Sequence, residues 1–387
     1  MQALHFGAGN IGKGFIGKVL NDNGYNICFV DVDEANIRAI NRYNEYIVEY
    51  LDENRSRTKV ASVEALNSQT QKSEVIEAVI NADVITTSVG AANLSKIAGL
   101  LGQGLMERVN RNRNKLDVIA NENAINASSI LRTEISRHLS HEQMTKLEVF
   151  VGFPNTAIDC LALSREDDKT VPLMEPYYEW VINESEMKNK QASPSSNVKY
   201  VKDLRYFIER KLFIVNMGHA AAAYLGRAAQ KTTIQDALKN FETKQCVRDA
   251  MKESSQYIQK EFCIGPEEAE EFIEEILERF ENPRVKDDVL RVGRNPVRKL
   301  GEHERLVKPL HEVLKLGGSV ENLAVVIAAA FMYSNSNDEE AVRLQRDVKA
   351  HGVTITIKKY TNIQNEKVIQ EIEKAYHKLQ INNGVIT

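Results

Sequence analysis

The sequence predicts an α/β protein in which an N-terminal Rossmann-type, doubly wound sheet is followed by a mostly α-helical C-terminal domain. An apolar run at the N-terminus breaks into the pattern G-x-G-x-x-G, and β-branched runs then alternate with helical patterns through the first half. That order is typical of a parallel sheet. The second half carries long amphipathic helices instead. Because 387 residues exceed one ordinary core, we expect two domains, at 1–192 and 193–387.

The glycine pattern follows the first expected strand, at 1–6, and opens a helical segment. Gly7 permits a tight turn, Gly9 lets the backbone approach a pyrophosphate, and Gly12 lets helix and strand pack closely. The helix N-terminus would offer free N–H groups to phosphates. The residues expected to contact a dinucleotide here are Gly7, Ala8, Gly9, Asn10, Ile11 and Gly12.

A second strand-like run, at 27–30, ends in Asp31, about twenty residues beyond the glycines. A carboxylate at this place accepts both ribose hydroxyls and repels a 2′-phosphate, so NAD is favoured over NADP. Because strand, glycines, helix, strand and acid occur in this order, a dinucleotide site explains them better than an ordinary glycine-rich turn.

Three further strand-like runs follow, at 83–90, 116–120 and 147–151. In doubly wound sheets the ligands lie beyond the carboxyl ends of the strands, so the residues after each run are candidates for the site. They include Asn123, in the sequence Asn-Glu-Asn after the second run, and Asn155, after the third.

The second half is expected to be helical beyond a polar linker at 191–197. Pro266 opens an amphipathic helix with one glutamate-rich face. The apolar run 323–333 is too short to cross a bilayer and predicts a buried core helix. Only 353–357, Val-Thr-Ile-Thr-Ile, alternates like a strand.

The composition narrows the class of protein. Apolar and charged fractions of 43% and 27% are those of a soluble globular protein. A net charge of −4 argues against nucleic acid or an anionic membrane as partner. Four scattered cysteines and the absence of a leader-like N-terminus favour a reducing, cytoplasmic location. No residues show metal-ligand spacing, so no metal is expected. A monomer is weakly favoured.

One stretch of the second half, 211–223, combines reactive groups with small neighbours. On an α-helix Lys211 and His219 lie about 80° apart, with Asn216 about 60° beyond His219, so all three share one face. A desolvated lysine can serve as a base near neutral pH, and an asparagine can donate to an oxygen that gains negative charge. Spacing alone favours a plainer explanation, in which the lysine lies at a helix start, the asparagine is a cap and the histidine is a core residue.

These motifs together resemble the polyol-specific long-chain dehydrogenases over nearly the whole chain. The resemblance rests on GAGNIGKGFIG at 7–17, Asp31, K-x4-N-x2-H at Lys211, and RVGRNPVRKL at 291–300. One departure is Lys13, where this family is expected to have arginine after GAGNIG. Because lysine keeps the charge, we expect it to touch only cofactor or solvent.

The resemblance implies a metal-free, NAD-dependent interconversion of D-mannitol 1-phosphate and D-fructose 6-phosphate where the two domains meet. It implies that Lys211 is the general base, that Asn216 polarises the reacting oxygen, and that His219 contacts the substrate. A second polarising asparagine is expected after a central strand. Asn123 is the best match and Asn155 is its competitor.

A sugar phosphate also needs cations, and guanidinium groups bind phosphate oxygens in pairs. The basic segment 291–305 contains five cationic side chains. Arg294, Arg298 and Lys299 are the candidates for binding the phosphate, and the other two are Arg291 and Arg305. Ion pairing or a solvated surface is the alternative explanation for them.

Other functions stay open at this point. The same three residues would serve a dehydrogenase of an unphosphorylated polyol or a hexuronate. A dehydrogenase of a hydroxy acid, or an NAD sensor without chemistry, is a more distant possibility.

Overall fold

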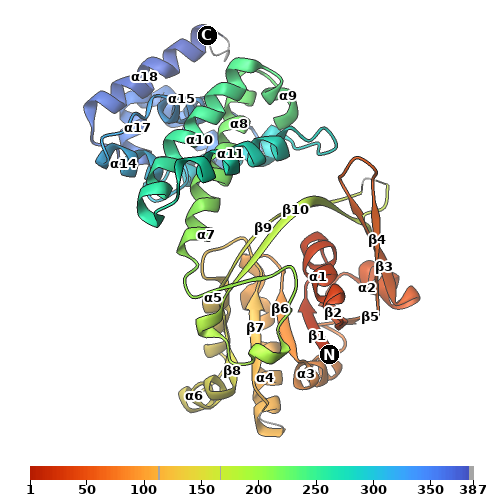
Figure 1. Ribbon diagram of the computed structural model, residues 1–387. Coiled ribbons are helices and arrows are strands. Elements are labelled where there is room, and N and C mark those ends of the chain that lie inside the picture. The colour runs from red at the N-terminus through yellow and green to blue at the C-terminus, as the bar shows by residue number, and fades with distance from the viewer. Residues whose placement is uncertain (112–113, 166, 383–387) are drawn as a thin grey trace. The chain divides into compact units, whose positions relative to one another are not determined.

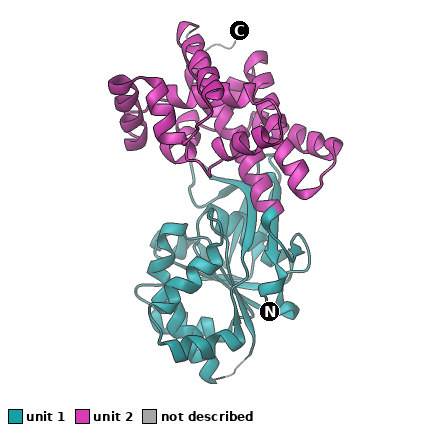
Figure 2. Cartoon of the chain, turned by 90° about the vertical axis from the view of Figure 1, so that its left-hand side faces the viewer, with its two compact units in different colours: residues 1–205 teal, residues 206–387 magenta. Residues whose placement is uncertain are grey.

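The computed structural model describes residues 1–111, 114–165 and 167–382. The chain forms two compact units, Met1–Arg205 and Tyr206–Thr387, shown in teal and magenta in Figure 2. The first unit is α/β and the second is helical, which confirms the predicted fold class.

The first unit is organised around a parallel sheet, which has six strands in the described residues, in the order β5-β2-β1-β6-β7-β8 (Figure 1). All five residues of β7 are buried, as expected for a sheet covered on both faces. The strands expected at 83–90 and 116–120 are confirmed as β6 and β7. The strands are β1 Gln2–Phe6, β2 Asn26–Asp31, β5 Val63–Asn67, β6 Val84–Thr87, β7 Leu116–Ala120 and β8 Val151–Gly152.

Alternate residues of the central strands enter two different cores, because side chains of a strand alternate between its faces. Leu4 and Phe6 of β1 pack with helices α3 to α6, whereas Ala3 packs with the glycine-rich turn and its helix. This arrangement makes the sheet doubly wound. The helices are η1 Ile11–Gly17 (a π-helical segment), α1 Lys18–Asp22, α2 Glu34–Tyr43, α3 Lys72–Asn81, α4 Leu94–Arg111, α5 Ala127–Ser136 and α6 His141–Phe150.

A second, smaller sheet belongs to the same unit, and the sequence analysis did not anticipate it. Its strand order is β11-β10-β3-β4, and β9 pairs with β10. Trp180 of β10 packs edge-on against Phe15 of η1, so this sheet supports the glycine-rich segment. Along β9 the side chains from Ala157 to Leu163 are all half-buried, which conceals the usual in–out alternation. The strands are β3 Glu45–Tyr50, β4 Arg57–Ala61, β9 Thr156–Ser164, β10 Pro172–Asn183 and β11 Lys199–Val201.

The strand predicted at 147–151 is largely wrong, because α6 continues to Phe150 and only Val151–Gly152 joins the sheet. Ser140 and Gln143 form a capping box that starts this helix. Met144 and Leu147 are buried on one face while Val149 is 57% exposed. Helical capping and spacing therefore override the strand preference of the β-branched run.

From Arg205 onward the described chain is helical. The central helix α8 is buried on nearly all sides and packs against α9, α10, α12 and α15. The helices predicted at Pro266 and at 323–333 are confirmed as α11 and α15. None of the described helices combines the length and hydrophobicity of a membrane-spanning segment. The elements are α7 Arg205–Arg210, η5 Lys211–Val215 (π-helical), α8 Asn216–Ala228, α9 Ile234–Leu238, α10 Phe241–Phe262, α11 Pro266–Glu281, α12 Val289–Gly293, α13 Pro296–Lys299, α14 Val307–Lys315, α15 Glu321–Met332, α16 Glu339–His351, α17 Val353–Thr361 and α18 Glu366–Ile381.

The strand predicted at 353–357 is wrong, since these residues begin helix α17. The buried side chains are Val353, Thr356 and Ile357, which have the i, i+3, i+4 spacing of a helix. Ile355, which a half-buried strand would place beside Val353 and Ile357, is 61% exposed. The alternation of β-branched residues here does not follow their burial.

His5 ties β1 to β6 inside the first unit. Its Nδ1 shares a hydrogen bond with Thr86 Oγ1 at 2.6 Å, and its Nε2 shares one with Ser88 Oγ at 2.8 Å. Burial lowers the pKa of His5 from 6.5 to about 3, against a smaller opposing effect of a backbone hydrogen bond at Gly7. The imidazole is therefore neutral in the folded protein at neutral pH.

We expect His5 to make the protein acid-sensitive. Between pH 6.5 and about 3 the unfolded chain binds a proton at this residue that the folded chain does not. The free energy of unfolding therefore falls as the pH drops below 6.5. Between about pH 7 and pH 5 the wild type should lose ~2 kcal/mol more than His5→Gln. Urea unfolding at both values measures this, and equal losses would contradict it.

Candidate functional site

The glycine-rich turn leaves no room for side chains at two of its residues. Gly7 has φ +105°, and a Cβ on it would lie 2.7 Å from the carbonyl oxygen of Ser88. A Cβ on Gly12 would lie 2.0 Å from the carbonyl oxygen of Gly7. The start of η1 is thus pressed onto the end of β1.

The other side of this turn is open. Gly9 is exposed, and nothing lies within 4 Å of the position that a Cβ would take there. Asn10 and Ile11, at the start of η1, are half-buried. Backbone N–H groups at the N-terminus of a helix attract anions, so these residues fit the pyrophosphate of a dinucleotide.

Asp31 lies beside the same turn, at the end of β2. Its Oδ2 accepts a hydrogen bond from the backbone N–H of Ala8 at 2.5 Å. Its Oδ1 accepts from Val32 and Asp33, at 2.6 Å and 3.0 Å. The structure therefore brings together the glycine segment and the carboxylate that the sequence assigned to one nucleotide site.

Lys13 differs from expectation. It is 2% exposed, and its Nζ donates to Asn36 Oδ1 at 2.9 Å and to the carbonyl oxygen of Thr170 at 2.7 Å. Burial lowers its pKa to about 8, against the opposing charges of Asp168, Asp31 and Asp33. The expectation that Lys13 touches only cofactor or solvent is wrong, because the loop after β9 covers it.

Glu122 connects the loops at the carboxyl ends of β6 and β7, next to this turn, a role that was not predicted from the sequence. Its Oε1 accepts from Thr87 Oγ1 at 2.8 Å and from the N–H of Val89 at 2.9 Å, and its Oε2 accepts from the N–H of Gly90 at 2.8 Å. One carboxylate thereby joins the end of β7 to the loop after β6. Its only sequence signal is its place after a buried strand.

The two asparagines considered for the second polarising role have different surroundings. The Asn155 side chain is 5% exposed; it donates to Ser129 Oγ at 2.7 Å and Glu186 Oε2 at 3.2 Å, and accepts from the Ser129 N–H. Asn123 is exposed, in the loop after β7. Asn155 is thus part of the packing, whereas the side chain of Asn123 is accessible to a ligand.

In the second unit, Lys211, Asn216 and His219 lie on one continuous helix. Lys211 begins the π-helical turn η5 and Asn216 begins α8, so the helix is wider between them than an ideal α-helix. All three are half-buried, while Phe213, Val215 and most of α8 are buried. Such π-helical turns occur often at functional sites.

The small residues of α8 allow close packing. A Cβ on Gly218, the residue before His219, would lie 2.5 Å from Sδ of Met251 in α10. The close contact with α10 holds the helix that carries the three polar side chains.

His219 has two defined neighbours. Its Nε2 lies 2.6 Å from Oδ2 of Asp287, and its ring stacks on Phe280 with centroids 4.8 Å apart. Burial raises the pKa of the Asp287 carboxyl, but the hydrogen bonds and charges of His219 and Arg291 outweigh it and hold that pKa below its usual range. Asp287 was not singled out from the sequence.

The basic segment divides into two groups. The Nε of Arg291 donates to Oδ1 of Asp287 at 2.9 Å. Lys299 is 4% exposed and its Nζ donates to the carbonyl oxygen of Arg294, whereas Arg294 and Arg298 are exposed. Burial, with the positive charges of Arg305, Arg298 and Arg294, lowers the pKa of Lys299 to about 7, although Asp338 opposes this.

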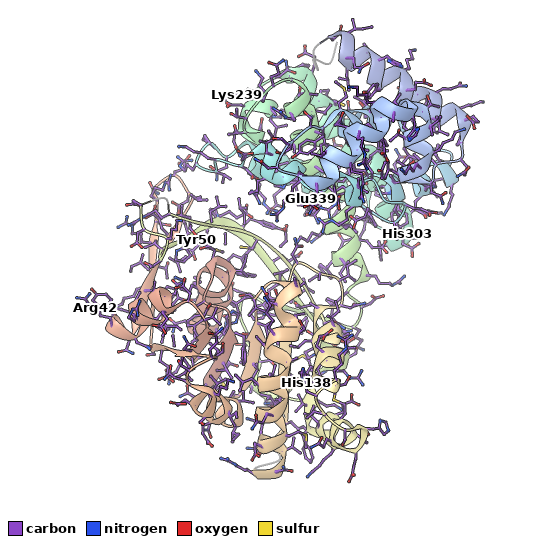
Figure 3. The ribbon with its side chains drawn as sticks, turned by 180° about the vertical axis from the view of Figure 1, so that it is seen from behind. Arg42, Tyr50, His138, Lys239, His303 and Glu339 are labelled. Atoms are coloured by element: carbon purple, nitrogen blue, oxygen red, sulfur yellow. The ribbon has the colours of Figure 1, made fainter. Side chains whose placement is uncertain are left out.

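Arg294 borders an open hollow of about 790 Å³ in the second unit. Acidic residues also border it, among them Glu339, which Figure 3 labels at the start of α16. Asp338 accepts there from the N–H of Asn295 at 2.8 Å, and Glu340 accepts from the N–H of Arg298 at 2.9 Å. Two of these carboxylates are thus engaged with backbone donors. Among the described residues no His, Cys, Asp and Glu side chains gather as a metal site would require.

Two family models match nearly all of the chain. Residues 1–195 match the mannitol dehydrogenase Rossmann domain, and residues 203–386 match the mannitol dehydrogenase C-terminal domain. A mannitol-1-phosphate 5-dehydrogenase of Geobacillus stearothermophilus is 38% identical over 368 residues, which cover 95% of this chain and 96% of the relative. One of Halalkalibacterium halodurans is 40% identical over 364 residues, covering 94% and 96%.

Solved structures with the same fold include two polyol dehydrogenases. The mannitol 2-dehydrogenase of Pseudomonas fluorescens, in ternary complex with NAD and D-mannitol, matches with a TM-score of 0.77 at 15% identity, covering 99% of this chain and 92% of that one. A D-sorbitol dehydrogenase in substrate-free form matches with a TM-score of 0.84 at 12% identity, covering 99% and 93%. Since the family models span both units and the relatives are similar along the whole length, the chain belongs to the mannitol dehydrogenase family.

Proposed function

We propose that this protein interconverts D-mannitol 1-phosphate and D-fructose 6-phosphate with NAD as cofactor. The observation that carries the proposal is the 38–40% identity, over nearly the full chain, to relatives named mannitol-1-phosphate 5-dehydrogenase. Lys211, Asn216 and His219, together on one half-buried helical stretch, support it. The first unit would bind the nucleotide, and the second would supply the proton-transfer groups. That the protein is a cytoplasmic monomer stays a prediction.

The first unit fits NAD through the turn at Gly7–Gly12 and the carboxylate of Asp31. The open space over Gly9 would take the pyrophosphate, and Asp31 would accept the ribose hydroxyls and repel a 2′-phosphate. When bound, the nicotinamide supplies or accepts the hydride. Ala8, Asn10 and Ile11 would add backbone contacts at the start of η1.

Lys211 would act as the general acid in reduction and as the general base in oxidation. In reduction of the ketone its ammonium group gives a proton to the carbonyl oxygen, and in oxidation the neutral amine takes that proton back. Asn216 would donate to the same oxygen, and Asn123, the accessible one of the two loop asparagines, is the candidate for the second polarising role. His219 would contact a neighbouring part of the sugar.

The phosphate would bind to the group formed by Arg294, Arg298 and Lys299. Arg294 and Arg298 are exposed and guanidinium groups match phosphate oxygens. Lys299 holds the backbone of Arg294 and adds a positive charge behind it. A phosphate dianion would relieve the repulsion among these cations, which supports an anion as the ligand of the segment.

The first test is the activity of Lys211→Ala. We expect wild type to oxidise NADH with fructose 6-phosphate and not with fructose, and the variant to lose about 10²–10⁴-fold in turnover because the proton donor is gone. Lys239→Ala is the matched control: Lys239, labelled in Figure 3, pairs with Asp236 and its side chain is 77% exposed. Absorbance at 340 nm measures each rate.

Equal rates on fructose would move the function to an unphosphorylated polyol. An active Lys211→Ala would overturn the lysine mechanism. An inactive Lys239→Ala would show that the loss of activity is not specific to Lys211.

Arg294→Ala tests the phosphate site. Removing a charge-assisted hydrogen bond should cost about 1.5–3 kcal/mol of binding, which raises KM for fructose 6-phosphate about 10- to 100-fold while kcat changes less. Arg346→Ala, whose side chain is 73% exposed on α16, is the control. An unchanged KM in Arg294→Ala would discard this residue as a phosphate ligand.

Lys299 should make substrate binding pH-dependent. Its pKa is about 7 in the free enzyme, and a bound phosphate dianion would raise it. Below pH 7 Lys299 is already protonated, but above pH 7 binding must recruit a proton, so KM for fructose 6-phosphate rises with pH. In Lys299→Met this rise should vanish, because methionine does not titrate. The pH dependence of KM is measured for wild type and Lys299→Met at saturating NADH. Parallel profiles would contradict a role of Lys299 in the pH dependence of binding.

A further inference from the structure

Asp287 holds His219 on one side and Arg291 on the other. Its Oδ2 lies 2.6 Å from Nε2 of His219, and its Oδ1 accepts from Nε of Arg291 at 2.9 Å. The carboxylate side chain is 4% exposed, whereas that of His219 is 24% exposed. The aspartate is therefore enclosed, whereas part of the histidine side chain stays accessible to a ligand.

The hydrogen bond with Asp287 determines which nitrogen of the His219 ring carries the proton. A carboxylate only accepts hydrogen bonds, so Nε2 of His219 must carry a hydrogen to bond to it. In the neutral ring Nδ1 then has no hydrogen and offers a lone pair. Phe280, stacked at 4.8 Å with an interplanar angle of 18°, restrains the plane of the ring.

We propose that Asp287 is a positioning residue that sets His219 in the Nε2–H tautomer, so that Nδ1 accepts a hydrogen bond from a hydroxyl group of the substrate. The proposal rests on the proposed function, in which His219 contacts the sugar. It adds the direction of that contact and the residue behind it.

The direction of this hydrogen bond limits what His219 can recognise. A lone pair on Nδ1 cannot bind the carbonyl oxygen of the ketose or a phosphate dianion, because these groups lack a hydrogen to donate. It can bind a hydroxyl on a carbon next to the reacting one, which both the polyol and the ketose carry. The same contact would therefore persist on both sides of the reaction and orient the reacting carbon.

Arg291 makes the substitution Asp287→Asn informative. A guanidinium group donates hydrogen bonds and cannot accept them, so it would retain Oδ1 of the new asparagine and turn Nδ2 toward His219. Nε2 would then have to accept, and the proton would move to Nδ1. The size of the side chain is preserved, but the histidine would offer a donor in place of an acceptor.

The tautomer can be read without any activity. In protein labelled with 15N-histidine at about pH 8, above the ordinary histidine pKa, NMR correlations of the imidazole nitrogens should show Nε2–H for His219 in wild type and Nδ1–H in Asp287→Asn. Loss of the signal in His219→Gln assigns it. An Nδ1–H ring in wild type, or no change in Asp287→Asn, would overturn the proposal.

Kinetics test whether Asp287 acts through His219. Asp287→Asn should raise KM for fructose 6-phosphate about tenfold, as loss of one neutral hydrogen bond does, with a smaller change in kcat. His219→Ala should give the same split, and adding Asp287→Asn to it should change nothing further. A second tenfold loss in the double variant would mean that Asp287 acts independently of the histidine and would overturn the proposal.

Asp347→Asn is the matched control for a merely structural role. Asp347 has a side chain 9% exposed and accepts from Nζ of Lys359 at 2.6 Å and from the Tyr360 hydroxyl at 2.7 Å. Its loss should lower thermal stability and leave KM unchanged. If wild type does not reduce fructose 6-phosphate at all, the proposed function fails, and the NMR result alone decides the role of Asp287.

Discussion

The contact between the backbones of Gly7 and Gly12 is the constraint on which the first unit depends. A Cβ on Gly12 would overlap the carbonyl oxygen of Gly7. Because glycine has no Cβ, the helical segment can begin directly at the end of β1. That contact aims the N-terminus of η1 at the open space over Gly9. Phe15, on the same segment, then packs against Trp180 of the smaller sheet, so both sheets of the unit meet at this helix.

Carboxylates in or beside the loops connect distant segments in both units. Asp31 and Glu122 accept backbone N–H groups from neighbouring loops of the first unit. Asp287 accepts from side chains instead, those of His219 and Arg291. Since a carboxylate can accept several hydrogen bonds, each of these residues joins segments that are distant in the sequence. Glu122 lies 35 residues from Thr87, and Asp287 lies 68 residues from His219.

The local chemistry of the sequence predicted much of the fold and part of the site. The glycine turn, Asp31 and the half-buried trio Lys211, Asn216 and His219 follow from motifs with fixed spacing. The strands predicted at 147–151 and 353–357 are wrong, because helical burial at both places, and a capping box at the first, outweigh the strand preference of β-branched residues. The smaller sheet was not predicted from the sequence. Its antiparallel pairs β3–β4 and β9–β10 are local, but the pairing that joins them into one sheet, β3 with β10, connects segments that are distant in the sequence.

The sequence by itself determined the fold class and the nucleotide turn, because glycine spacing and hydrophobic periodicity act over a few residues. It also placed the lysine, asparagine and histidine on one helix. Only the tertiary structure decided the partners of these groups: that Lys13 is buried under the loop at Thr170, and that Arg291 pairs with Asp287 rather than joining Arg294. Hydrogen bonds of buried charges depend on which distant segment packs beside them, and local sequence does not specify that.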